Sequence, residues 1–272
     1  MALWILLAAL SLSCTVEGSF KKGTCAYPGN LLCDDFNVLN NMSWWYDWHM
    51  DLSFYHDKVG QHCNSTPHLV HKHIPMVKKF NNHTQLTIQT WGRFILGFNE
   101  PDHADQADMT PQEAAAAWPE IEKNSHGAKL VSPTTAGPNF KWYDEFFRLC
   151  HGCRIDFIAA HMYRCDAHEI MSYLQQLYHK YNKKIWLTEF ACPQTHDENK
   201  QLHLMKTLLP QLEAADYVFR YSWFSARIHP KHADRYVNPS ASLLKANSSE
   251  LTMIGQFYNS FHVPYHSSHI VG

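Results

Sequence analysis

The chain alternates short apolar runs with helical patterns along most of its 272 residues, and this alternation limits the possible folds more than any other feature. Apolar runs of this length are typical of strands covered on both faces in a parallel sheet. Strands that alternate with helices indicate repeated βα units. Eight runs fit this description: residues 23–28, 42–48, 73–79, 93–98, 129–134, 156–163, 184–190 and 217–224. The sequence therefore predicts an α/β fold, a single (β/α)8 TIM barrel.

Helix signals lie between several of these runs. Residues 110–113 form a capping box with proline in the first turn. Apolar residues recur at helical spacing over 170–181 and 202–212, and a last helix is expected at 251–261. Only about a dozen residues separate the third and fourth runs, which barely suffices for a crossover helix. We expect an abbreviated unit there.

The first eighteen residues have the pattern of a signal peptide. An apolar core at 3–12 precedes small and polar residues at 16–18, and the core is too short to span a bilayer. Residues 19–272 then match the length of about 250 residues that is usual for one barrel domain. We expect a secreted, extracellular protein.

The charge balance excludes two classes of partner. With 23 basic and 25 acidic residues the net charge is -2, and no basic footprint for nucleic acid or for a membrane surface is present. We expect a monomer.

Four sequons fit passage through a secretory pathway, at Asn41, Asn64, Asn82 and Asn247. Because Asn41 precedes the second predicted strand, a glycan there is expected at the face opposite the carboxyl ends of the strands. Asn82 follows the third predicted strand, so a glycan there is expected near the mouth of the barrel.

Seven cysteines lie outside the predicted signal peptide, at positions 25, 33, 63, 150, 153, 165 and 192. In an oxidising compartment they predict three disulfides and one free thiol. The Cys150-x-x-Cys153 spacing would also suit a redox pair or half of a zinc site. A structural disulfide is favoured, because no second Cys-x-x-Cys completes a four-thiolate site.

One disulfide can be predicted from the topology. Cys165 lies four residues past His161, and Cys192 lies three past Glu189, so both should emerge at the mouth on neighbouring strands. We expect a Cys165–Cys192 bridge beside Glu189. The other pairings cannot be read from the sequence.

Two apolar runs end in carboxylates: "RFILGFNEPD" at 93–102 and "KIWLTEFAC" at 184–192. In a barrel, Glu100 and Glu189 would both project into the mouth at the carboxyl ends of the strands. A pair of carboxyl groups is what glycoside hydrolysis requires, one as acid and one as nucleophile or base, without a cofactor.

Polar and aromatic side chains lie at equivalent depth on the same strands: Asn99, His161, Tyr163, Tyr221 and Trp223. Such groups bind sugar hydroxyls and stack on pyranose rings. We expect these five side chains to bind substrate.

Five motifs, in chain order, together resemble glycoside hydrolase family 128: "SWWYDW", "LGFNEPD", "DFIAAHMY", "WLTEFAC" and "YSWF". The resemblance covers residues 22–258. It implies a retaining glycoside hydrolase catalytic barrel over residues 19–272, active on β-1,3-glucan polysaccharide or oligosaccharide, with no cofactor and no metal. By the same resemblance Glu100 is the general acid/base and Glu189 the nucleophile. Asn99 is then expected to bind the hydroxyl next to the attacked carbon.

The chain departs from the family pattern at several positions. The family often has Tyr-Asn-Trp where this chain has Tyr46, Asp47 and Trp48, and Gln106 begins a stretch where the family commonly has Gln-x-Asn. We expect Tyr46, Trp48 and Gln106 to bind substrate. These departures leave the catalytic positions intact and bear on glucan linkage and subsite affinity.

Three alternatives remain open. One is a catalytically weak or inactive glycan-binding barrel, in which extra acids such as Asp47 and Asp102 mistune the carboxylate pair. A second is a glycosidase for another β-glucan linkage. A third is a zinc protein, because His68, His71 and His73 lie close together in "HLVHKH". No His-Glu-x-x-His or paired Cys/His framework supports the zinc alternative.

Overall fold

The computed structural model describes residues 19–81, 84–89, 93–230 and 236–262. The predicted signal peptide and the sequon at Asn82 lie outside these ranges. Among the helices within them, none has both the length and the apolar character that crossing a bilayer requires.

Parallel strands form the centre of the molecule. The described residues contain β1 (Lys22–Cys25), β2 (Trp44–Tyr46), β3 (Phe94–Leu96), β4 (Lys129–Val131), β5 (Ile158–His161), β6 (Ile185–Phe190) and β7 (Val218–Trp223). Five of them form a sheet in the order β2-β1-β7-β6-β5, and β3 pairs with β4 in a second sheet. Every pairing is parallel. The predicted parallel α/β fold is confirmed.

Single bridges rather than ladders connect the two sheets. Val131 bridges Phe157 just before β5, Met76 bridges Leu96 in β3, and His73 bridges Trp45 in β2. The segment 73–76 therefore lies between β2 and β3 but does not form the third strand predicted at 73–79. Pro75 gives a physical reason, because it has no N–H to donate to a ladder. The closed eight-stranded barrel is thus confirmed only in part.

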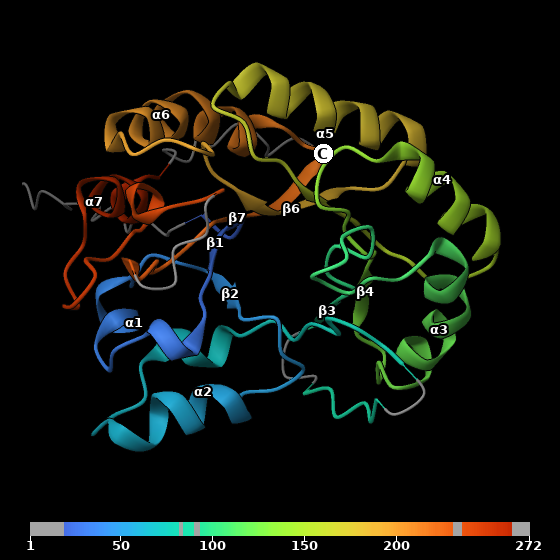
Figure 1. Cartoon of the computed structure of the whole chain (residues 1–272), viewed down its shortest axis with the longest axis horizontal. Helices are drawn as coiled ribbons and strands as arrows, with labels where there is room; N and C mark the ends of the chain where they lie inside the picture. Colours follow the sequence, from blue (N-terminus) through green and yellow to red (C-terminus); the bar gives the residue numbers. More distant parts are fainter. Residues whose placement is uncertain (1–18, 82–83, 90–92, 231–235, 263–272) are drawn as a thin grey trace, which may run out of the picture.

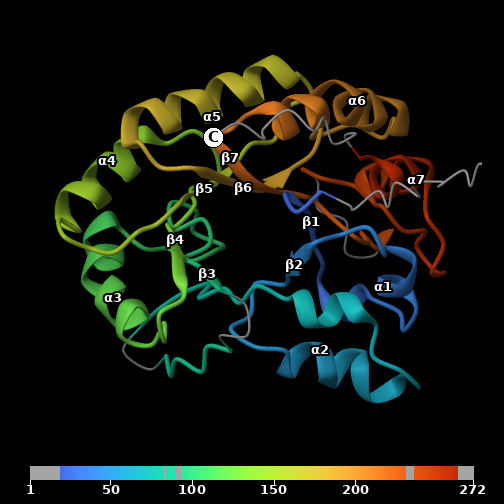
Figure 2. The ribbon, with the colours of Figure 1, turned by 180° about the vertical axis from the view of Figure 1, so that it is seen from behind.

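The helices surround the strands (Figures 1 and 2). They are α1 (Asp35–Val38), α2 (Ser53–Lys58), α3 (Pro111–Lys123), α4 (Phe140–Leu149), α5 (Ala167–Tyr181), α6 (Glu198–Ala214) and α7 (Met253–Ser260). The capping box predicted before α3 is present between Thr110 and Glu113. Residues 77–81, 84–89 and 93 form no helix, which fits the predicted abbreviated unit.

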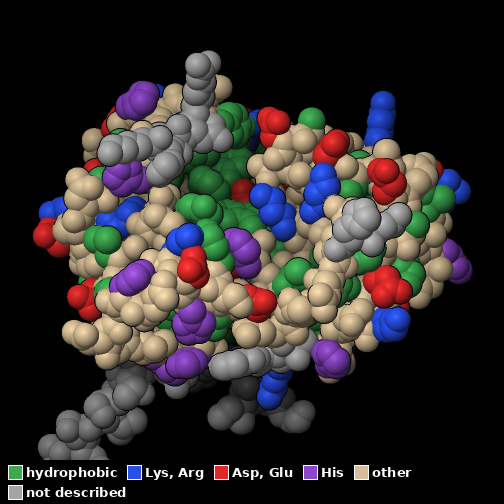
Figure 3. Space-filling view, turned by 60° about the horizontal axis from the view of Figure 1, so that its bottom comes forward, with side chains coloured by type: hydrophobic (Ala, Val, Ile, Leu, Met, Phe, Trp, Pro, Cys, Tyr) green, Lys and Arg blue, Asp and Glu red, His purple; other side chains and the backbone are tan. Residues whose placement is uncertain are grey.

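Two apolar layers form the core. One fills the space enclosed by the strands and includes Trp44, Trp186 and Leu96; the other lies between strands and helices. Towards the amino ends of the strands, the Arg220 guanidinium lies 4.9 Å from the ring centroids of Phe94 and Trp186. Because the interior is filled, a ligand site has to lie at an end of the strands. The surface shows a hollow on one face (Figure 3).

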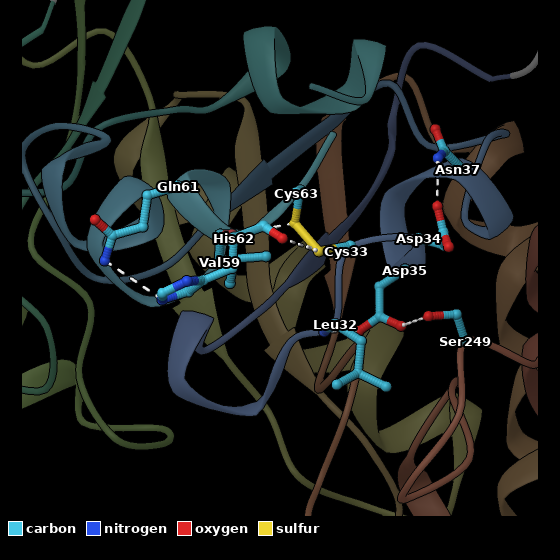
Figure 4. Close-up of a disulfide and its surroundings, with 10 residues drawn as sticks. All are labelled: Leu32, Cys33, Asp34, Asp35, Asn37, Val59, Gln61, His62, Cys63 and Ser249. Carbon is cyan, nitrogen blue, oxygen red and sulfur yellow. Dashed lines mark hydrogen bonds between the residues drawn. A yellow bond between two sulfur atoms is a disulfide. The ribbon is translucent and has the colours of Figure 1, made fainter. Parts of the chain in front are cut away.

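The described residues contain three disulfides, and among them the thiol of Cys25 is free and buried. The predicted Cys165–Cys192 bridge is confirmed, with 4.3 Å between the Cα atoms. The Cys150-x-x-Cys153 pair is a disulfide as well. The third bridge, between positions 33 and 63, ties the segment before α1 to the turn after α2 (Figure 4).

Two consecutive lysines connect β1 to the carboxyl ends of two distant helices. The Lys21 ammonium donates to the carbonyls of residues 212, 213 and 215 at the end of α6. The Lys22 ammonium donates to those of residues 258, 259 and 261 at the end of α7. Carbonyls in the last turn of a helix lack intrahelical partners and carry partial negative charge. Burial lowers the pKa of Lys22 to about 8.

We predict that Lys22→Met lowers the free energy of unfolding by about 3 kcal/mol, because three carbonyls lose a charged donor while the aliphatic stem is retained. Denaturant unfolding at neutral pH measures the change. Lys200→Met, at an exposed position on α6, is the control and should stay within about 0.5 kcal/mol of wild type. Equal stability of the two variants would show that the cap contributes nothing.

Candidate active site

A cavity of about 660 Å³ opens at the carboxyl ends of the strands. Six of the predicted site residues line it: Trp48, Asn99, Glu100, Gln106, Tyr163 and Glu189. The hollow seen in Figure 3 likewise combines hydrophobic walls with an acidic group. This volume lies within the range of small-molecule sites.

Glu189, near the end of β6, is more enclosed than Glu100, with 5% of its side chain exposed. Its Oε1 accepts hydrogen bonds from the Tyr46 hydroxyl and the Trp48 indole, each at 3.0 Å. Its Oε2 accepts one from the Tyr163 hydroxyl at 2.5 Å. Burial raises the pKa of Glu189, while His161 and the bonds from Tyr163 and Trp48 act against that rise. The three donors fix the orientation of this carboxylate.

Glu100 lies just past β3 and has a left-handed backbone, with φ at 46°. A non-glycine residue rarely adopts this conformation, and such residues concentrate at functional sites. His161 Nδ1 lies 2.8 Å from Oε1 of Glu100 and 3.5 Å from Oε2 of Glu189. Although burial acts to raise the pKa of Glu100, the hydrogen bond and charge of His161 lower it below its usual range.

The two carboxylates and the imidazole form a compact group, with one oxygen or nitrogen of each within 4.8 Å of the others. They are the potential metal ligands that the described residues bring together. A metal on Nδ1 would require the proton on Nε2 of His161, which is buried without a hydrogen-bond partner. The group therefore suits proton transfer better than a resident metal. His68, His71 and His73 form no such group within the described ranges.

Asn99 and Gln106 lie beside Glu100. The Asn99 amide donates to Oε1 of Gln106 at 3.3 Å, while its own Oδ1 is buried without a partner. A buried, unsatisfied amide oxygen in a cavity wall is an acceptor that a hydroxyl of a ligand can reach.

Two of the predicted site residues lie beneath the cavity rather than in its lining. Tyr46 is fully buried under Glu189, and His161 is fully buried between the carboxylates. Both contact the carboxylates directly. Their side chains can act on a ligand through those carboxylates.

The prediction that Tyr221 and Trp223 face the cleft is wrong. Tyr221 donates to Glu213 of α6, and Trp223 donates to the carbonyl of Ala241; both side chains are fully buried outside the cavity. Successive side chains of a strand point to opposite faces of the sheet. Tyr221 and Trp223 are two positions apart, so both point to the same face, away from the cavity. Phe224, the next residue, lines the cavity.

Sequence reasoning missed seven residues of the lining: Lys78, His103, Asp105, Ala136, Phe224, Tyr236 and Val237. The aromatic members form a wall, because the ring centroid of Tyr163 lies 5.8 Å from that of Phe224 and 5.4 Å from that of Tyr236. The alternation of side chains along β7 would have identified Phe224. The others belong to loops, for which the sequence carries no comparable periodic signal.

A family model described as glycosyl hydrolase catalytic core matches residues 24–258. A curated relative, Alkali-sensitive linkage protein 1 of Schizosaccharomyces pombe, is 31% identical over 219 residues. That match covers 76% of this chain and 39% of the relative, so the chain spans about two fifths of the relative's length.

Two solved structures are similar along nearly their whole length. One is a subgroup II endo-β-1,3-glucanase of glycoside hydrolase family 128 from Sorangium cellulosum, with a TM-score of 0.71, 31% identity and coverage of 88% of this chain and 98% of that chain. The other is a subgroup I endo-β-1,3-glucanase of that family from Amycolatopsis mediterranei in complex with laminaritriose, with a TM-score of 0.70, 25% identity and coverage of 89% and 99%.

We predict that Tyr163→Phe raises the pKa of Glu189. The variant removes a hydrogen bond that stabilises the ionised carboxylate in the wild type. A ¹³C NMR titration of the Glu189 carboxyl, assigned with Glu189→Gln, measures the shift. Tyr27→Phe, at an exposed tyrosine, should leave the titration unchanged. An unaltered pKa of Glu189 in Tyr163→Phe would contradict this prediction.

Proposed function

Because the chain belongs to glycoside hydrolase family 128, we propose that it is a retaining endo-β-1,3-glucanase that uses Glu189 as nucleophile and Glu100 as general acid/base. The two solved relatives are endo-β-1,3-glucanases, one of them with laminaritriose bound. Their activity supports the same linkage for this chain.

The spacing of the two carboxylates is the observation that carries the proposed mechanism. One oxygen of Glu100 lies within 4.8 Å of one oxygen of Glu189. Retaining enzymes place their carboxyl groups about 5 to 5.5 Å apart, whereas inverting enzymes need about 6.5 to 9.5 Å to admit a water. The short spacing favours double displacement.

The hydrogen bonds support different roles for the two carboxylates. Glu189 accepts from three donors that fix its oxygens and stabilise negative charge, as a nucleophile requires. Glu100 has 12% of its side chain exposed, lines the cavity, and contacts the titratable imidazole of His161. It is the better placed of the two to exchange protons with substrate and water.

In the proposed reaction Glu100 protonates the glycosidic oxygen while Glu189 attacks the anomeric carbon and forms a glycosyl-enzyme ester. Glu100 then takes a proton from water, which hydrolyses the ester and returns Glu189 to the carboxylate form. Glu100 must be protonated for the first step. Bound sugar excludes water from this carboxyl, and desolvation raises its pKa above the value that His161 imposes in the free protein.

Substrate contacts follow from the cavity lining. The unpartnered Oδ1 of Asn99 accepts a hydroxyl next to the attacked carbon. Trp48, Tyr163 and Phe224 provide aromatic surface for pyranose faces. Gln106 extends the polar side beyond Asn99.

We further propose that residues 19–272 act as one monomeric catalytic barrel outside the cell, after removal of residues 1–18. Three disulfides are consistent with an oxidising compartment. The sequon residues Asn41, Asn64 and Asn247 are exposed and accessible for glycosylation.

We predict that wild type cleaves linear β-1,3-gluco-oligosaccharides with retention of anomeric configuration, and that Glu189→Gln lowers kcat by about 10⁴-fold or more. Mass-resolved product analysis and ¹H NMR of the first products measure both. Glu120→Gln, which alters an exposed carboxylate on α3, is the control and should match wild type.

Azide tests the two roles separately. With Glu100→Ala it should give a glycosyl azide of retained configuration, and with Glu189→Ala one of inverted configuration, because azide replaces water in the first case and the nucleophile in the second. The reverse outcome would exchange the roles. Binding of oligosaccharide without cleavage by wild type would instead favour a glycan-binding barrel.

A further inference from the structure

A third acid, Asp47, lies next to the site without lining it. It stands between Tyr46 and Trp48, which both donate to the same oxygen of Glu189. Its side chain is fully buried. A buried carboxylate needs compensating partners, so its contacts indicate what it does.

Two histidines hold this carboxylate. Nε2 of His73 is hydrogen-bonded to Oδ1 of Asp47 at 2.8 Å. Nδ1 of His49 lies 2.8 Å from the backbone carbonyl oxygen of Asp47 and 3.3 Å from Oδ2, which itself has no hydrogen-bond partner. Burial acts to raise the pKa of Asp47, but His49 and His73 lower it below its usual range. The Asp47 carboxylate thus lies between His73, which is hydrogen-bonded to it, and His49, which is held at its main chain.

Both histidines are fixed by their own packing. The ring of His73 lies 4.8 Å from that of Trp45, and His73 forms the bridge to β2. The ring of His49 stacks on Phe54 of α2 at 4.5 Å. The clamp therefore joins the end of β2 to the segment 73–76 on one side and to α2 on the other.

Asp47 also contacts the backbone that follows Trp48. Its Oδ1 accepts the backbone N–H of His49 at 3.2 Å, which closes a turn over Trp48. Trp48 has a left-handed backbone, with φ at 63°. A bulky aromatic residue keeps this conformation only where its surroundings enforce it.

We propose that Asp47 is a positioning residue, which through its clamp between His73 and His49 locks the left-handed turn at Trp48 and so aims the indole at Glu189. The indole N–H stabilises the nucleophile only from that position, 3.0 Å from Oε1. Asp47 itself touches neither the cavity nor the reacting atoms. The kinetic part of this inference rests on the proposed function.

Three variants test the proposal with β-1,3-gluco-oligosaccharides. Asp47→Ala should lower kcat by about 100-fold, as expected for a misplaced catalytic group, with a much smaller change in KM. Asp47→Asn keeps an acceptor for His73 and for the His49 N–H, so it should restore most of kcat. His49→Gln leaves the buried pair with His73 intact and should cost about 10-fold. Asp57→Ala, at an exposed acid of α2, should match wild type.

The position of the indole is measured independently of hydrolysis. The ¹⁵N–¹H resonance of Trp48 Nε1, assigned with Trp48→Phe, should shift in Asp47→Ala and His49→Gln and return towards the wild-type position in Asp47→Asn. An unshifted resonance in His49→Gln and in folded Asp47→Ala, with kcat unchanged, would overturn the proposal. If wild type cleaves no glucan, the proposed function fails, and the resonance alone decides the role of Asp47.

Discussion

The structure depends on one constraint: the Glu189 carboxylate, with 5% of its side chain exposed, needs hydrogen-bond donors at the end of a strand. Water has little access to it, so the protein supplies three donors. Two come from β2 and its following turn, and one from the segment after β5. In the sheet order β2-β1-β7-β6-β5, the donors reach Glu189 of β6 both from an adjacent strand and from across the enclosed space. The pairing of the five strands thus determines which donors reach the two carboxylate oxygens of Glu189.

Backbone strain lies where this network meets the cavity. Glu100 and Trp48 both have left-handed φ values, and they lie four residues past β3 and two residues past β2. Each contributes a side chain to the carboxylate pair or to its hydrogen bonds. In a regular strand these side chains would point to one or the other face of the sheet. The turn at the strand end redirects them across the mouth, and packing around it keeps that direction.

Much of this arrangement could be predicted from the sequence, because apolar runs ending in Glu100 and Glu189 carry a local signal. The parallel α/β fold, the bridge between the mouth cysteines and the abbreviated unit follow from the same runs. The orientation of Tyr221 and Trp223 could not be read, since a strand buried on both faces shows no alternation. The contact of Asp47 with His73 could not be predicted from the sequence either. The two residues are 26 positions apart, and only the single bridge between Trp45 and His73 brings their segments together.

The lysine caps on α6 and α7 have a consequence for the order in which contacts form during folding. β1 is synthesised before α7, and the first carbonyl acceptor of Lys22 lies 236 residues further along the chain. The Lys22 ammonium therefore gains these three acceptors only after the end of α7 has been synthesised. Because β1 also pairs with β7, the larger sheet requires segments far apart in the sequence to be present together, and contacts of such high sequence separation slow folding.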